Sequence, residues 1–153
     1  MNAGGSQGTS PSIPKTSEAI QVGVAGCDLS CQPRHSYRIR LQETTYSIAR
    51  FNNTGGQVSS VLIQNTGTTD VRGYLYFWSD SGALLATVAL GPQPQGFLAP
   101  KALVVIDTSS IPALQDQSGS VTVSNDARYG MLSGKAVTFN GIQAYETQME
   151  PRR

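Results

Sequence analysis

The sequence predicts an all-β protein, an antiparallel β-sandwich of eight or nine strands that follows an extended N-terminal arm. Three observations lead to this prediction. Short runs of strand-forming residues recur at intervals of about ten residues, a spacing typical of β-sandwiches. The 153 residues include 16 Gly and 8 Pro, which supply turns between these runs. Charged residues make up only 14% of the chain, and no long helical periodicity is visible.

We divide the chain into an arm, residues 1–36, and a β-domain, residues 37–153. The first 19 residues lack hydrophobic periodicity and contain too few apolar side chains to build a core. Ile20, Val22 and Val24 then alternate with small or polar residues, which favours a short strand. A cysteine-containing loop is expected to follow. The expected strands of the β-domain are, in order, residues 37–41, 46–51, 58–64, 72–79, 83–90, 102–106, 118–124, 135–139 and 142–147.

The clearest strand is predicted over residues 72–79. Its side chains alternate, so that Tyr74, Tyr76 and Trp78 share one face while Leu75 and Phe77 share the other. We expect Trp78 to lie in the core, because aromatic side chains contribute much of the buried area of a core. The alternative is an exposed aromatic stripe, which would mark a ligand-binding face or a subunit interface.

Turn signals connect several of these strands. An Asp-Ser-Gly turn at residues 80–82 and an Asn-Gly pair at residues 140–141 each predict a hairpin. A single helical turn is expected around residues 110–114, with Ser109 or Ser110 as its N-cap.

Several segments of the β-domain together resemble a bacterial Ig-like module of uncharacterised exported or surface proteins. In such modules one strand ends in Asn, and a later strand ends in a Ser/Asp-Gly turn followed by Leu-Leu. The resemblance covers about residues 46–140 and implies an Ig-like β-sandwich in an exported or cell-surface protein. It concerns turns and core positions, so it implies little about activity. The segments that carry the resemblance are VLIQNTG (61–67), GYLYFWSDSGALL (73–85), LAPK (98–101), QSGSVTV (117–123) and YGMLSGKAV (129–137).

The charge distribution argues against nucleic-acid binding. The net charge is +1, and no extended basic surface is indicated. Arg34, Arg38 and Arg40 form a local positive cluster, but Asp28 and Glu43 flank it.

No segment of the sequence is expected to span a membrane as a helix. The longest apolar run, residues 83–90, is far shorter than the roughly 20 residues that a spanning helix needs. No signal peptide is recognisable at the start of this chain. We nevertheless expect an extracellular or cell-surface location, in which case this chain would be a mature or trimmed form.

The two cysteines and the single histidine fall within nine residues of one another, and this cluster can be interpreted in three ways. We favour a disulfide between Cys27 and Cys31, since paired cysteines are typical of exported β-domains. Reduced, inert thiols would suit a cytoplasmic protein. A metal site would need a fourth ligand besides Cys27, Cys31 and His35, from Asp28 or from a partner subunit. Haem attachment is unsupported because Gln32 stands where the ligating histidine would be.

No catalytic constellation is apparent, so we expect neither an enzyme nor a cofactor. His35 lies before the core in a loop that contains Pro, which disfavours a Ser-His-Asp site. Ser133 and Lys135 could imitate a Ser-Lys pair, but a turn followed by a strand explains them better. Carboxylates could also bind Ca²⁺ or hydrolyse glycosides, yet turn formation accounts for them. The acidic residues expected in turns are Asp70, Asp80, Asp107, Asp116 and Asp126.

These observations predict a non-catalytic structural or interaction module. Its expected partner is a protein or a second copy of itself. The arm residues Ile20, Val22 and Val24 would add as a strand to a neighbour's sheet edge. The alternative is a carbohydrate-binding module that stacks polysaccharide on the aromatic face of the 72–79 strand.

Overall fold

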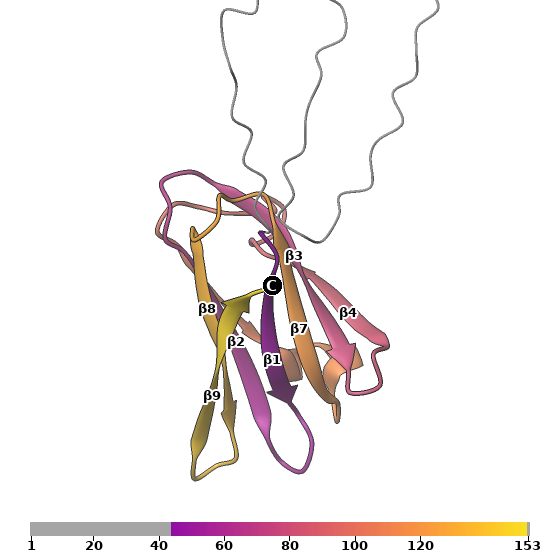
Figure 1. Ribbon diagram of the computed structural model, residues 1–153. Coiled ribbons are helices and arrows are strands. Elements are labelled where there is room, and N and C mark those ends of the chain that lie inside the picture. Colours follow the sequence, from indigo (N-terminus) through magenta and orange to yellow (C-terminus); the bar gives the residue numbers. More distant parts are fainter. Residues whose placement is uncertain (1–43, 153) are drawn as a thin grey trace, which may run out of the picture. The chain divides into compact units, whose positions relative to one another are not determined.

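The computed structural model describes residues 44–152, which form an all-β domain of nine strands (Figure 1). Two short 3-10 helices, Thr108–Ser110 and Pro112–Leu114, connect the sixth and seventh strands. The strands are β1 (Tyr46–Asn52), β2 (Val58–Asn65), β3 (Val71–Ser79), β4 (Leu84–Ala89), β5 (Phe97–Leu98), β6 (Leu103–Asp107), β7 (Ser118–Asn125), β8 (Leu132–Phe139) and β9 (Ala144–Pro151).

All paired strands are antiparallel, and they form one curled sheet in the order β4-β3-β7-β1-β9-β8-β2-β6, with β5 beside β3. The curl depends on β9, which pairs with two different strands along its length. Its first half pairs with β8, where Ala144 lies opposite Phe139, and its second half pairs with β1, where Met149 lies opposite Ile48. The sheet is therefore a half-barrel whose two ends, β4 and β6, are not paired with each other. The Ig-like sandwich remains a prediction.

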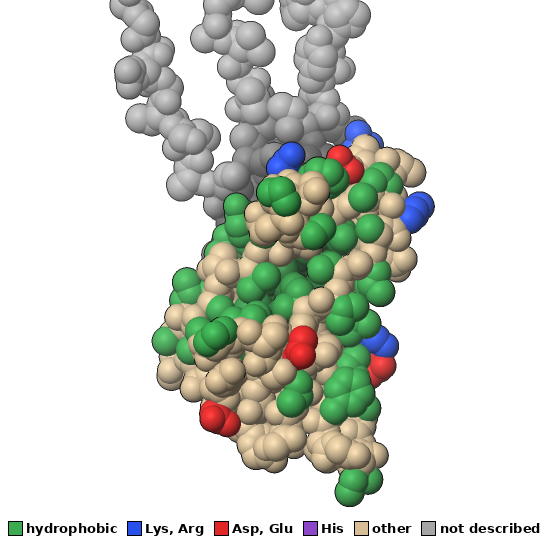
Figure 2. Space-filling view, turned by 180° about the vertical axis from the view of Figure 1, so that it is seen from behind, with side chains coloured by type: hydrophobic (Ala, Val, Ile, Leu, Met, Phe, Trp, Pro, Cys, Tyr) green, Lys and Arg blue, Asp and Glu red, His purple; other side chains and the backbone are tan. Residues whose placement is uncertain are grey.

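The core lies on the concave side of this curled sheet. Strict alternation along the strands sends one set of side chains inward, as the sequence predicts for Ile48, Val121 and Val123. Leu75 and Phe77 of β3 are buried with them. Phe51 and Phe77 meet edge to face, with ring centroids 5.4 Å apart. In Figure 2, which views the domain from behind, hydrophobic side chains gather in the middle of the surface, and some are set back in a hollow.

Buried polar side chains tie the loop after β1 to the middle of the chain. The hydroxyl of Thr108 lies 2.7 Å from the side-chain oxygen of Asn53 and 2.6 Å from the carbonyl oxygen of Ser59, so these two acceptors share its single proton. Asn53 also donates to the carbonyl of Leu114 at 2.8 Å. Within residues 44–152 no buried side-chain nitrogen or oxygen lacks a hydrogen-bond partner. This network therefore holds the loop after β1 against the 3-10 helices and β2.

The structure corrects three local expectations. The helical turn is split into two 3-10 helices, and the residue that caps the first is Asp107 rather than Ser109 or Ser110. The carboxylate of Asp107 accepts from the backbone N–H of Ser109 at 2.9 Å, which a residue inside the turn cannot do. Ser133 does not form a turn before a strand, because β8 already begins at Leu132. The last strand extends to Pro151 instead of ending at residue 147.

The Asn-Gly hairpin between β8 and β9 is confirmed. The backbone N–H of Asn140 donates to the carbonyl of Gln143 at 3.1 Å, and Gly141 has a φ of 86°, which glycine adopts readily. The strand expected at residues 37–41 lies outside the described residues.

Candidate functional site

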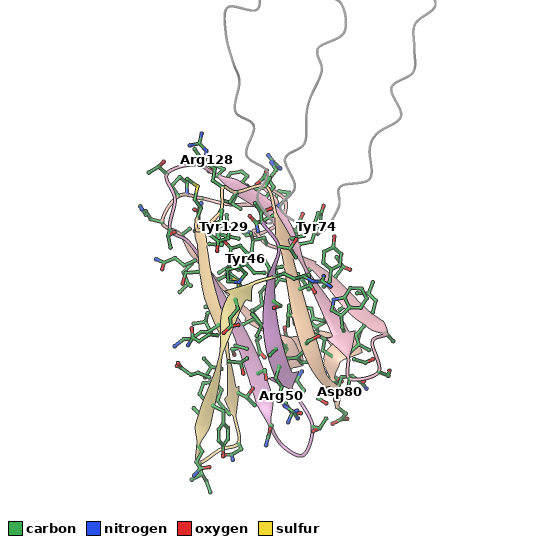
Figure 3. The ribbon with its side chains drawn as sticks, in the orientation of Figure 1. Tyr46, Arg50, Tyr74, Asp80, Arg128 and Tyr129 are labelled. Carbon is green, nitrogen blue, oxygen red and sulfur yellow. The ribbon has the colours of Figure 1, made fainter. Side chains whose placement is uncertain are left out.

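The candidate site is a row of three aromatic side chains on the convex, outer face of β3, which we call the aromatic ladder: Tyr74, Tyr76 and Trp78. Neighbouring rings lie 6.4 Å and 6.5 Å apart, centroid to centroid, and are tilted by 46° and 31°. Tyr74 is 51% exposed, whereas Tyr76 and Trp78 are half-buried. Figure 3 shows Tyr74 near the upper end of β3 and Asp80 just beyond its lower end.

The expectation that Trp78 lies in the core is wrong. The predicted alternation itself is confirmed, since Leu75 and Phe77 are completely buried on the inner face. Trp78 must then point outward with Tyr74 and Tyr76, because a strand offers only two directions. The indole N–H makes the outer position favourable, since it donates to the hydroxyl of Thr122 on β7 at 3.1 Å.

Hydroxyl groups line one side of the aromatic ladder. The strand register places Tyr74 opposite Ser124, Tyr76 opposite Thr122 and Trp78 opposite Ser120, all three on β7. Residues directly opposite in antiparallel strands point to the same face, so these hydroxyl side chains stand beside the rings. On the other side, Tyr76 lies opposite Thr87 of β4 and Tyr74 lies opposite Ala89. None of these neighbours carries a charge.

The upper end of the aromatic ladder is closed by a residue pair that sequence reasoning missed. Arg72, also on the outer face of β3, places its guanidinium carbon 5.6 Å from the centre of the Phe97 ring. Phe97 reaches this position because the two-residue strand β5 pairs with the start of β3, with Phe97 opposite Arg72. The sequence gives only a weak signal for it, namely a single aromatic residue after a loop rich in Gly and Pro.

The Ser133 and Lys135 pair and possible metal ligands were the remaining candidates for a site within the described residues. Ser133 and Lys135 both lie within β8, and Lys135 forms an ion pair with Glu146 of β9, so its amine is occupied by a neighbouring strand. Within residues 44–152 no three His, Cys, Asp or Glu side chains come close enough to hold a metal ion. In the same range no helix is long and apolar enough to cross a lipid bilayer.

Two sets of sequence-predicted site residues lie outside the described part of the chain. They are the cysteine and histidine cluster of Cys27, Cys31 and His35, and the alternating arm residues Ile20, Val22 and Val24. The disulfide, the metal site and the self-association arm therefore stay predictions.

Comparison with known proteins supports the fold and nothing more specific. No known protein family matches the sequence, and no curated protein is similar to it. One similar solved structure is described as the crystal structure of Thermotoga maritima 1070, with a TM-score of 0.51 at 9% sequence identity. The likeness covers 69% of this chain and 89% of that chain. At this identity it concerns the fold alone, because one fold hosts many functions.

Proposed function

We propose that this protein is a non-catalytic binding module of an exported or cell-surface protein, and that the aromatic ladder on β3 binds a neutral polysaccharide. The observation that carries the proposal is the outward position of Tyr74, Tyr76 and Trp78 beside the hydroxyl-bearing strand β7. The Ig-like assignment belongs to the same proposal, since it came from a resemblance to exported modules.

The chemistry of this face suits a sugar chain better than other ligands. Sugar rings have apolar faces of C–H groups that stack on aromatic rings, and hydroxyl groups around their edges that exchange hydrogen bonds with Ser and Thr. A row of rings along one strand fits a linear ligand. The registered neighbours on β4 and β7 are uncharged, and Arg72 at the upper end is engaged with the Phe97 ring, so the face favours a neutral ligand over a highly charged one.

The proposal can be tested with the full chain and soluble polysaccharides. Because Trp78 is the only Trp, its fluorescence reports directly on the aromatic ladder. We expect a neutral glycan, from a panel of β-glucan, xylan and mannan, to change the intensity or wavelength of this emission. A charged glycan such as alginate serves as the comparison and is expected to bind less.

A matched pair of tyrosine substitutions distinguishes loss of binding at the aromatic ladder from loss of binding caused by removing any exposed tyrosine. Tyr74 and Tyr145 of β9 are exposed to nearly the same extent, 51% and 52%. Removing a stacked ring costs about 1 kcal/mol, so Tyr74→Ser should weaken binding roughly fivefold by calorimetry, while Tyr145→Ser leaves it unchanged. Equal losses in both variants, or no response to any glycan, would rule out the aromatic ladder as the binding surface.

A further inference from the structure

The three rings of the aromatic ladder do not share a plane. The ring of Tyr74 is tilted by 46° from that of Tyr76, and the ring of Trp78 is tilted by 31° from that of Tyr76. The right-handed twist of a strand turns successive outward side chains relative to one another in this way. A flat object laid parallel to the middle ring would therefore meet each outer ring at an angle too large for face-to-face stacking.

The rings also differ in how far they stand out from the sheet. Tyr74 is 51% exposed, whereas Tyr76 and Trp78 are half-buried. The indole of Trp78 is held toward β7, because its N–H donates to the hydroxyl of Thr122 at 3.1 Å. A flat surface that approaches β3 therefore reaches Tyr74 first and cannot stack on all three rings at once.

The curvature of the sheet further limits contact with a flat surface. β3 lies between β4 and β7 (Figure 1), and its outer face is on the convex side of the half-barrel. Both neighbouring strands therefore bend away from a plane that touches β3. The hydroxyl groups of Ser120, Thr122 and Ser124 on β7 would lie behind such a plane, although they stand beside the rings.

The two sides of the aromatic ladder differ in chemistry. On β7 every residue opposite a ring carries a hydroxyl group. On β4 the residues opposite the rings are Leu84, Thr87 and Ala89, of which Thr87 alone carries a hydroxyl, and Leu84 is 52% exposed. A single glycan chain lying along β3 can rest on the rings and turn a hydroxyl-rich edge toward β7. In a crystalline polysaccharide both edges of each chain are occupied by neighbouring chains, so no free edge is available.

We propose that the aromatic ladder binds a single glycan chain in a twisted conformation, and that it does not bind the flat surface of a crystalline polysaccharide. This inference rests on the proposed function and adds the physical form of the ligand. A free chain can rotate about its glycosidic bonds until successive sugar rings follow the tilts of Tyr74, Tyr76 and Trp78. Its edges are also open to hydrogen bonding, whereas a chain fixed in a crystal can neither rotate nor expose both edges.

The test compares soluble and crystalline forms of the same polymers, namely β-glucan, xylan and mannan. Binding of the full chain to a hexasaccharide of each is measured by the fluorescence of Trp78. Binding to microcrystalline cellulose, crystalline xylan and crystalline mannan is measured by the loss of protein from solution. Each stacked ring contributes about fivefold in affinity, so a flat surface that stacks on one ring instead of three should bind roughly 25-fold more weakly. We expect binding to a soluble chain and little or no depletion by its crystalline form.

Substitutions identify which rings make the contact. Tyr76→Ser removes the middle ring and should weaken binding of the hexasaccharide about fivefold, whereas the control Tyr145→Ser, outside the aromatic ladder, should leave it unchanged. Urea unfolding checks that each variant is folded. Tyr74→Ser, at the more exposed position, makes the same test if Tyr76→Ser does not fold.

The outcomes separate this inference from the proposed function. Binding to a crystalline form that depends on Tyr74 and is as strong as binding to the soluble chain would overturn the inference and leave the proposed function standing. Binding of the hexasaccharide that is weakened by Tyr74→Ser but not by Tyr76→Ser would mean contact with one ring, which also overturns the inference alone. Binding that neither substitution weakens, or no binding to any glycan, would overturn both.

Discussion

The aromatic ladder on β3 and the free edge at β6 are both exposed apolar regions of the same curled sheet, yet they differ in the polar groups that accompany their apolar side chains. Each ring of the aromatic ladder stands beside a residue with a hydroxyl group, and Trp78 uses its N–H to bond Thr122. The exposed side chains of β6, Leu103 and Val105, are purely aliphatic and contain no polar atom. Amphipathic aromatic residues are stable at a wet surface that exchanges ligands, whereas a bare aliphatic strand is stable only when covered. The polarity of the first region therefore suits the reversible ligand binding proposed above, whereas the second region is a bare aliphatic edge.

The largest expected effect comes from the core directly beneath the aromatic ladder. Phe77→Ala removes a completely buried ring that packs against Phe51, and should lower the free energy of unfolding by about 3–5 kcal/mol. Tyr74→Ala, three residues earlier on the opposite face, should cost less than about 1 kcal/mol. Urea unfolding followed by circular dichroism measures both. Similar losses in the two variants would contradict the assignment of the two faces of β3.

The next effect concerns the close approach of β3 and β7 at the lower end of the aromatic ladder. A Cβ added at Gly119 would lie 1.8 Å from the carbonyl oxygen of Trp78, so Gly119→Ala must push the two strands apart. We expect a loss of about 3 kcal/mol in thermal or urea unfolding, together with a change in Trp emission. Gly141→Ala is the control. Its Cβ would meet nothing within 4 Å, so only the strain of its positive φ remains, about 1 kcal/mol.

A smaller effect is expected from the hydrogen bond that orients Trp78. Thr122→Val keeps the side-chain shape but removes the hydroxyl that accepts the indole N–H, which should cost about 1 kcal/mol of stability. We expect the Trp emission to change, and affinity for a bound glycan to fall by a similar factor. Ser124→Ala, beside Tyr74, provides the comparison because it removes a hydroxyl without touching Trp78. An unchanged emission in Thr122→Val would show that this bond does not fix the indole in solution.

The smallest effect on stability is expected at β6. Leu103→Thr with Val105→Thr replaces two outward side chains by residues that still favour strands, so unfolding should change by no more than about 0.5 kcal/mol per site. The same double variant should show less nonspecific aggregation at high concentration. A large loss of monomer stability would mean that these side chains already have partners within their own domain, which would weaken the contrast between the two regions.

Local features of this domain were predictable from sequence, because they depend on neighbouring residues. Alternation correctly grouped the side chains of β3 into two faces, and the Asn-Gly pair correctly placed the β8–β9 hairpin. Alternation does not show which of the two faces is buried, and the large apolar area of Trp78 wrongly favoured the core. The sheet order and the pairing of β5 with β3 depend on contacts between distant residues, which no local pattern encodes. For that reason Arg72 and Phe97 could not be connected to the candidate site.

The double pairing of β9 has a consequence for how the protein can be made. The first strand of the described domain finds a partner in the last one, with Tyr46 opposite Pro151 and the backbone N–H of Arg152 bonded to the carbonyl of Thr45 at 2.9 Å. During synthesis, β1 can pair with β7 but not with β9 until the final strand has left the ribosome. Until then the β8 and β2 half of the sheet has no strand to connect it to β1. A chain that ends before β9 would therefore have two parts of the sheet that no strand pairing connects. Such unpaired edges are prone to aggregation.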